Sequence, residues 1–162
     1  HLGVRRQRQM CIRDRPYSLE IAPKASADMV LTFRNVHNVV MNIYGGGKYA
    51  ELSFQAMYDA LKPGGVLGVV DHQWDDVATE DPVSENGYIS RERTIKLAES
   101  AGFKLVDSSE VLRNPKDTKD YKYGVWTLPP VLALKDEDKE KYLAIGESDR
   151  FLLKFEKPVK QE

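Results

Sequence analysis

The sequence has little cysteine and no long apolar run, and each shortage excludes a class of protein. Cys11 is the single cysteine, so a disulfide within the chain and a cysteine-based zinc site are both excluded. No run of eighteen apolar residues occurs, so we expect no membrane span. The compartment stays open, because a cytoplasmic location is the default and an exported protein is also compatible with few cysteines.

Negative charge outweighs positive charge beyond the first fifteen residues of this 162-residue chain. Residues 1–15 hold five arginines and one acid, a net of +4, so the overall charge of −1 leaves −5 for the remainder. A nucleic-acid-binding surface needs its positive charge clustered on the folded domain. We therefore expect no nucleic-acid partner.

The arginine-rich start is unlike the sequence that follows it. It has no serine and no apolar stretch, which makes it a poor transit peptide and a poor secretory signal. Its string RQRQMCIRDR resembles translated adapter sequence. We predict that residues 1–15 are a non-native or disordered tract and that residues 16–162 form one partial domain; the alternative for the tract is a basic arm.

A strand, a helix and a second strand are predicted in the first half of the body. Residues 28–33 and 66–70 are short, apolar, β-branched runs typical of buried parallel strands. Between them, residues 49–61 repeat apolar side chains at helical spacing and end at the Pro-Gly-Gly of residues 63–65. Two parallel strands joined by a helix form a right-handed crossover unit.

The second half continues with alternating elements and two long loops. We predict a helix over residues 90–101 capped by Ser90, a strand from residue 103, and a helix over residues 136–145. The alternation in residues 151–155 predicts an edge or antiparallel strand. The long segments 73–87 and 113–134 are polar and contain proline, which is typical of lids or binding loops. Glu147, Asp149 and Arg150 are expected to form a turn with local ion pairs.

This order of elements, with LKPGG at residues 61–65 and AESAGF at residues 98–103, resembles the second half of a class I S-adenosylmethionine-dependent methyltransferase. Five blocks resemble one bacterial subgroup of predicted methyltransferases: ADMVLTFRNVHN (27–38), LKPGGVLGVVDH (61–72), NPKDTKDY (114–121), GVWTLPP (124–130) and YLAIGESDRFLLKFEKP (142–158). The resemblance implies an α/β fold, the C-terminal half of a Rossmann-like sheet. Its strands would be mostly parallel with the last one antiparallel, and helices would cover both faces.

The same resemblance implies that part of the family's fold is missing here. The glycine-rich turn that carries the cofactor belongs to the first half-sheet, and only about twelve residues precede the first strand after the arginine-rich tract. We therefore expect a C-terminal fragment that is inactive alone, from a protein whose cofactor is S-adenosyl-L-methionine and whose methyl acceptor is a small molecule.

The position and chemistry of the residues that follow the first strand indicate roles for them. Phe33, Arg34 and Asn35 are expected at the cofactor, because ligands of open α/β sheets bind beyond the carboxyl ends of the strands. Asn35 and His37 are the expected catalytic residues, with Asn35 positioning the reactants and His37 accepting a proton. The alternative is that Asn35 and Asn38 cap a turn and His37 is a solvated loop residue.

Asp71, His72 and Trp126 are expected in the substrate pocket. The alternatives are that Asp71 caps the following turn and that Trp126 anchors the late loop to the core. A second enzyme class, a metal-dependent hydrolase, would use His37, Asp71 and His72, but no ligand spacing such as HExxH supports it and we expect no metal. The third hypothesis for the function is that the chain is an inactive association module. The sequence does not indicate an oligomeric state.

Overall fold

The computed structural model describes residues 19–41 and 46–159, so the arginine-rich tract 1–15 lies outside the described residues. The elements in chain order are β1 (Ala27–Phe33), α2 (Val36–Val40), α3 (Gly46–Ala60), β2 (Leu61–Trp74), β3 (Ile89–Ser90), α4 (Arg91–Ser100), β4 (Lys104–Ser109), the 3₁₀ helix η2 (Gly124–Thr127), α5 (Lys139–Ile145) and β5 (Arg150–Glu156). No helix in this part of the chain is long and apolar enough to cross a bilayer.

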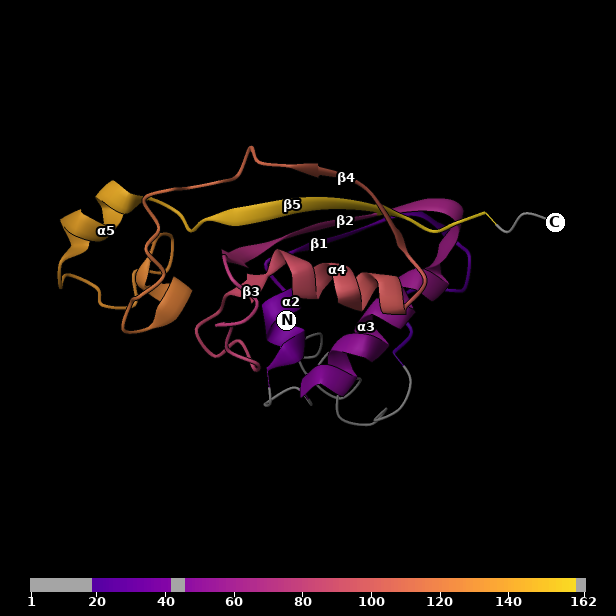
Figure 1. Cartoon of the computed structure of the whole chain (residues 1–162), viewed down its shortest axis with the longest axis horizontal. Coiled ribbons are helices and arrows are strands. Elements are labelled where there is room, and N and C mark those ends of the chain that lie inside the picture. The colour runs from indigo at the N-terminus through magenta and orange to yellow at the C-terminus, as the bar shows by residue number, and fades with distance from the viewer. Residues whose placement is uncertain (1–18, 42–45, 160–162) are drawn as a thin grey trace, which may run out of the picture.

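The strands form one sheet in the order β1-β2-β5-β4, with the short β3 paired to the end of β2. β1 and β2 run parallel, and β5 runs antiparallel to both of its neighbours (Figure 1). The predicted α/β architecture with an antiparallel last strand is therefore confirmed.

The helices α2, α3 and α4 lie together on one face of the sheet (Figure 1). Their apolar side chains pack against alternate residues of the strands, and the resulting core includes Phe54, Leu67, Val69, Leu153 and Phe155. Residues of β1 that point to the other face are more than half exposed: Met29, Leu31 and Phe33. We expected helices on both faces of the sheet, but in the described residues they lie on one face only. Successive side chains of a strand point to opposite faces, so the β1 side chains that point away from the helices stay exposed.

The LKPGG segment belongs to a strand and not to a helix end. α3 ends at Ala60, and β2 begins at Leu61, which pairs with Ala27. Lys62, the second residue of β2, forms an ion pair with Asp28 of β1 at 2.7 Å. A Cβ at Gly65 would lie 2.8 Å from the carbonyl oxygen of Lys62, so only glycine fits this close backbone approach.

The ends of α4 are as predicted from the sequence. Ser90 accepts a hydrogen bond from the backbone N–H of Arg93 at 3.2 Å, which caps the helix. Gly102 follows with a φ of 104°, a conformation that glycine adopts without strain. α5 is shorter than predicted, since it begins at Lys139 and not at Asp136.

Candidate functional site

Two histidines and an aspartate meet where the parallel strands β1 and β2 end. The carboxyl ends of parallel neighbours lie at the same sheet edge, which brings the residues after Phe33 close to those at Asp71. Arg34 and Asn35 connect β1 to α2, and this five-residue helix turns the side chain of His37 back toward β2. The sequence predicted a loop here, because a helix this short has no visible periodicity.

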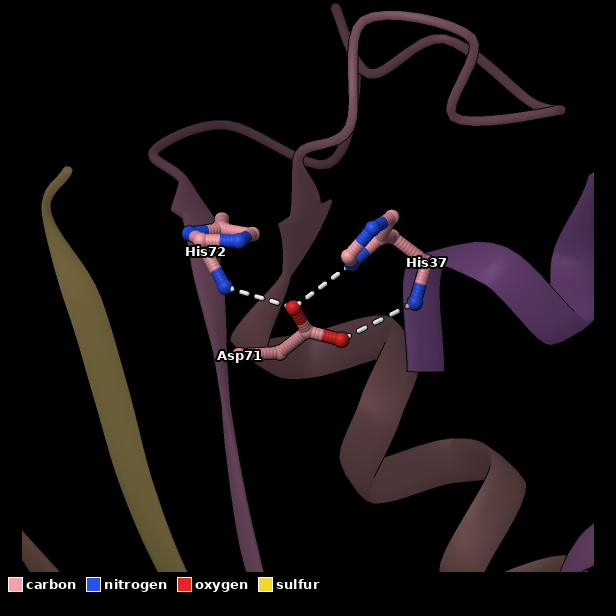
Figure 2. Close-up of side chains that lie close together, drawn as sticks. All are labelled: His37, Asp71 and His72. Atoms are coloured by element: carbon pink, nitrogen blue, oxygen red, sulfur yellow. Dashed lines mark hydrogen bonds and ion pairs between the residues drawn. The ribbon is translucent and has the colours of Figure 1, made fainter. Parts of the chain in front are cut away.

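Asp71 is completely buried and holds His37 in place. Its Oδ1 atom lies 2.7 Å from Nδ1 of His37, and its Oδ2 atom accepts a hydrogen bond from the backbone N–H of His37 at 2.9 Å. Oδ1 also accepts from the backbone N–H of His72 at 2.8 Å. Figure 2 shows the carboxylate between the two histidines, with both of its oxygens in use.

The hydrogen bond to Asp71 fixes the protonation pattern of His37. A carboxylate only accepts hydrogen bonds, so Nδ1 carries a proton, and the tautomer that this selects for the uncharged ring has its lone pair on Nε2. Figure 2 shows this second nitrogen on the side of the ring away from Asp71. Nε2 has no hydrogen-bond partner among the described residues, and His37 lines a cavity. The alternative of a solvated loop histidine is wrong, since the side chain is buried on α2.

His72 is buried beside His37, with their ring centroids 5.2 Å apart. Its Nδ1 atom lies 2.5 Å from the hydroxyl of Ser148. Burial lowers the pKa of His72 to about 4, an effect that Asp71 opposes and that Arg150, Arg34 and, when it is protonated, His37 increase. His72 is therefore neutral at physiological pH.

A cavity of about 210 Å³ opens beside the two imidazoles, and we call it the histidine cavity. Its lining residues are Phe33, Arg34, His37, Asn38, His72, Val125, Trp126, Pro129, Pro130 and Val131. Trp126 stands edge-on to His37 with the ring centroids 6.1 Å apart. Five of the residues singled out in the sequence thus line one cavity: Phe33, Arg34, His37, His72 and Trp126.

Two of the expected site residues lie elsewhere. Asp71 does not line the histidine cavity, because it is fully buried and its oxygens are bonded to His37 and His72. It supports His37 from behind, which corrects its expected place in the substrate pocket. Asn35 is exposed and lines a second cavity at the free edge of β1, together with residues of α3 such as Tyr49 and Ser53. We call this second space the edge cavity.

The sequence did not reveal a buried polar network that holds the segment between β4 and α5, the late segment, next to the site. Asp149 is 2% exposed and binds the Arg113 side chain at 2.8 Å and the ammonium of Lys119 at 3.0 Å. Burial alone would raise the pKa of Asp149, but these hydrogen bonds and that of the Asn114 N–H hold it below its usual value. The prediction of a turn with local ion pairs holds only for Glu147 and Arg150.

Asp117 extends this network toward β3. It accepts a hydrogen bond from the hydroxyl of Tyr88 and another from the backbone N–H of Asp149 at 2.8 Å. The buried position and the adjacent carboxylate raise the pKa of Tyr88. Acidic residues in a polar loop give no sequence signal of burial, so only the pairing in space identifies this network.

His37, Asp71 and His72 also form the one cluster in the described residues whose side chains could hold a metal ion, with one ligand atom from each lying within 4.8 Å of the others. Oδ1 of Asp71 accepts two hydrogen bonds and Oδ2 accepts one, so a metal ion at this carboxylate would compete with the bonds that hold His37 and His72. The geometry agrees better with a histidine oriented by a carboxylate than with a metal centre.

No protein-family model and no curated protein matches the chain, but solved structures share its fold. One is the cyclase SpnF, with a TM-score of 0.57 at 16% identity over 88% of this chain and 54% of that one. A methyltransferase of Methanosarcina mazei has a TM-score of 0.54 at 10% identity, over 88% and 64%. A putative sarcosine dimethylglycine methyltransferase of Galdieria sulphuraria has 0.52 at 15%, over 85% and 56%.

These likenesses establish the fold, which is that of class I S-adenosylmethionine-dependent methyltransferases. The chain spans between about half and two thirds of the length of these structures. Because SpnF is described as a cyclase, the fold alone does not decide the reaction.

Proposed function

We propose that this chain forms the acceptor-binding half of an S-adenosylmethionine-dependent methyltransferase of the bacterial subgroup that its sequence blocks resemble. One observation carries the proposal: His37 lies buried at the carboxyl end of a parallel strand, with Nδ1 held by Asp71 and Nε2 open to a cavity. A small acceptor placed in the histidine cavity would meet a ready proton acceptor.

The described residues fit one end of the cofactor. Phe33, Arg34 and Asn35 follow one another between the two cavities, with Phe33 and Arg34 on the histidine cavity and Asn35 on the edge cavity. The edge cavity, about 250 Å³, is lined mainly by apolar side chains, and no carboxylate of the described chain lines it. A preceding segment would therefore have to supply the groups that bind the ribose and the amino-acid end.

In this proposal the chain's own residues position the acceptor and take its proton. When bound, the cofactor supplies an electrophilic methyl group on sulfur. Asn35 would hold the reactive end of the cofactor from the edge cavity, and Trp126 would cover the acceptor in the histidine cavity. His37 accepts the proton at Nε2, while Asp71 is a positioning residue that stabilises the imidazolium formed.

Cofactor binding is tested on the protein extended upstream in its natural reading frame. S-adenosylhomocysteine should raise its melting temperature, because a ligand that binds only the folded state stabilises it. Asn35→Ala should weaken this binding about tenfold by removing a hydrogen-bonding group. Gln55→Ala is the control: it removes an exposed carboxamide of α3 that lines neither of the two cavities, and it should leave the binding unchanged.

The outcomes separate this proposal from its alternatives. No stabilisation at millimolar S-adenosylhomocysteine would favour the inactive association module. Stoichiometric zinc, manganese or iron in the purified protein, lost in His72→Gln, would favour the metal-dependent hydrolase. Residues 1–162 alone are expected to show no measurable affinity for S-adenosylmethionine, so tight binding by this chain would contradict the division of the site that we propose.

A further inference from the structure

The walls of the histidine cavity carry hydrogen-bonding and positive groups but no negative ones. Arg34 supplies a guanidinium, and His37 and His72 supply imidazoles. No aspartate or glutamate of the described chain lines the cavity, and the nearest carboxylate, Asp71, is buried behind His37 with its oxygens hydrogen-bonded. A group that becomes negative inside the cavity is stabilised there, and an ammonium group is not.

The orientation of His37 further limits which chemical groups could be the methyl acceptor. A carboxylate is already ionised at neutral pH and gains nothing from a proton acceptor, since its pKa is about 4. A thiol, with a pKa of about 8.5, is partly ionised by itself and is a strong nucleophile. A phenolic hydroxyl, with a pKa of about 10, stays protonated and needs a base as it attacks. The Asp71–His37 pair suits this last case.

The other residues that line the histidine cavity suit an acceptor with a flat apolar ring. Phe33, Val125, Trp126, Pro129 and Pro130 make up the apolar walls. The volume of about 210 Å³ lies below the usual range for drug-sized ligands, which begins at roughly 300 Å³. The cavity therefore has room for a single substituted ring and not for a large polycyclic compound.

We propose that the acceptor is a small phenol or a comparable enol, bound with its hydroxyl against Nε2 of His37 and its ring against Trp126. This inference rests on the proposed methyl transfer and adds the substrate class. In the reaction the oxygen–methyl bond forms as the sulfur–methyl bond breaks, and the electron pair of that bond stays on sulfur. The hydroxyl proton goes to Nε2 of His37 and then to solvent. Arg34 and neutral His72 face the oxygen as its negative charge develops.

The first experiment measures binding by residues 1–162, since the chain itself contains every residue of the cavity. The probes are 4-methylphenol, toluene and 4-methylbenzoate, and the signal is the NMR resonance of the Trp126 indole, assigned with Trp126→Phe. We expect 4-methylphenol to bind at least about tenfold more tightly than toluene, because its hydroxyl pairs with His37. His37→Phe should abolish the preference over toluene. The control Lys154→Gln, at an exposed position of β5, should keep it.

The second experiment uses the three compounds as methyl acceptors for the upstream-extended protein, which keeps the inference testable if residues 1–162 aggregate. We expect 4-methylphenol alone to be methylated, at a rate that falls by ~10²-fold or more in His37→Phe. Methylation of 4-methylbenzoate but not of 4-methylphenol would overturn the phenol assignment while the proposed methyltransferase stands. Binding of 4-methylphenol that depends on His37, without cofactor binding or methyl transfer, would refute the proposed function and leave the cavity assignment intact. Equal binding of all three probes would overturn the inference.

Discussion

His37 and His72 lie side by side, yet different groups hold their Nδ1 atoms. The partner of His37 is the Asp71 carboxylate, and the partner of His72 is the Ser148 hydroxyl. A carboxylate stabilises an imidazolium, whereas a hydroxyl in a buried setting does so much less. At the residue scale the pair therefore divides into a histidine suited to accept a proton and a histidine that stays neutral.

The lowered pKa of His72 predicts a loss of stability in mild acid. Its pKa is about 4 in the folded chain and about 6.5 when unfolded, so the unfolded state binds more protons between these values. Stability is consequently greatest above pH 6.5 and falls as the pH drops toward 4. We expect the His72 contribution to the free energy of unfolding to fall by about 2 kcal/mol from pH 7 to pH 5.

Urea denaturation of the wild type and of His72→Gln at both pH values checks this prediction. The variant should lose less stability than the wild type on acidification, because its glutamine does not titrate. The comparison at pH 7 serves as the control, since His72 is neutral there in both states of the wild type. An identical pH dependence in the two proteins would show that His72 is protonated normally when folded.

The late segment between β4 and α5 has little regular structure, and polar contacts keep it in place. Asp149, at the start of β5, binds Arg113 and Lys119, and Asp117 binds Tyr88 next to β3. Val125 also donates a backbone hydrogen bond to the carbonyl of Asn86. At the scale of elements, these contacts hold η2, and with it Trp126, over the histidine cavity.

Asp149→Ala should release this segment. Without Asp149, Arg113 keeps only the exposed carboxylates of Glu110 and Asp75, and Lys119 keeps only that of Asp75. We expect the loss of the buried charged hydrogen bonds to lower the free energy of unfolding by about 1.5–3 kcal/mol. Limited proteolysis should cut faster within residues 113–134. The control is Glu147→Ala, two residues earlier, which removes an exposed pair with Arg150 and should cost less than about 1 kcal/mol. Equal effects of the two variants would contradict a role for the buried network.

The sheet as a whole is covered unequally. α2, α3 and α4 lie on one face (Figure 1). On the other face Met29, Leu31 and Phe33 expose apolar surface. The free edge of β1 adds unpaired backbone groups beside the same residues, because β1 pairs only with β2 in the described chain. An apolar surface that continues onto an unpaired edge favours association.

We therefore expect residues 1–162 to self-associate at micromolar concentrations. Leu31, which is 55% exposed and leans over Gly68, lies in the middle of this surface, so Leu31→Lys should shift the population toward the monomer in sedimentation velocity. Val111→Lys introduces the same charge at a position that is 75% exposed beyond β4, and should not. A monomeric wild type, or equal effects of both variants, would show that the exposed face does not drive association.

Local pattern was sufficient to predict most of the elements. The helical spacing of Ala50 and Phe54 and the cap at Ser90 act between neighbours in the chain, so they can be read without the fold. The end of α3 was predicted one residue late, because Leu61 continues the apolar spacing while its backbone pairs with Ala27 of β1. α2 was missed because five residues carry too little pattern.

By itself the sequence determined the order of elements and the position of polar residues after β1 and β2, since both depend on local propensity and alternation. The tertiary structure alone decided how those residues combine. It bonded Asp71 to His37 across 34 positions, separated Asn35 from His37 by the turn into α2, and buried Asp149 beneath the late segment. These contacts depend on which chemical groups meet in the buried interior, where an unpaired charge is costly. The sequence pattern does not contain that information.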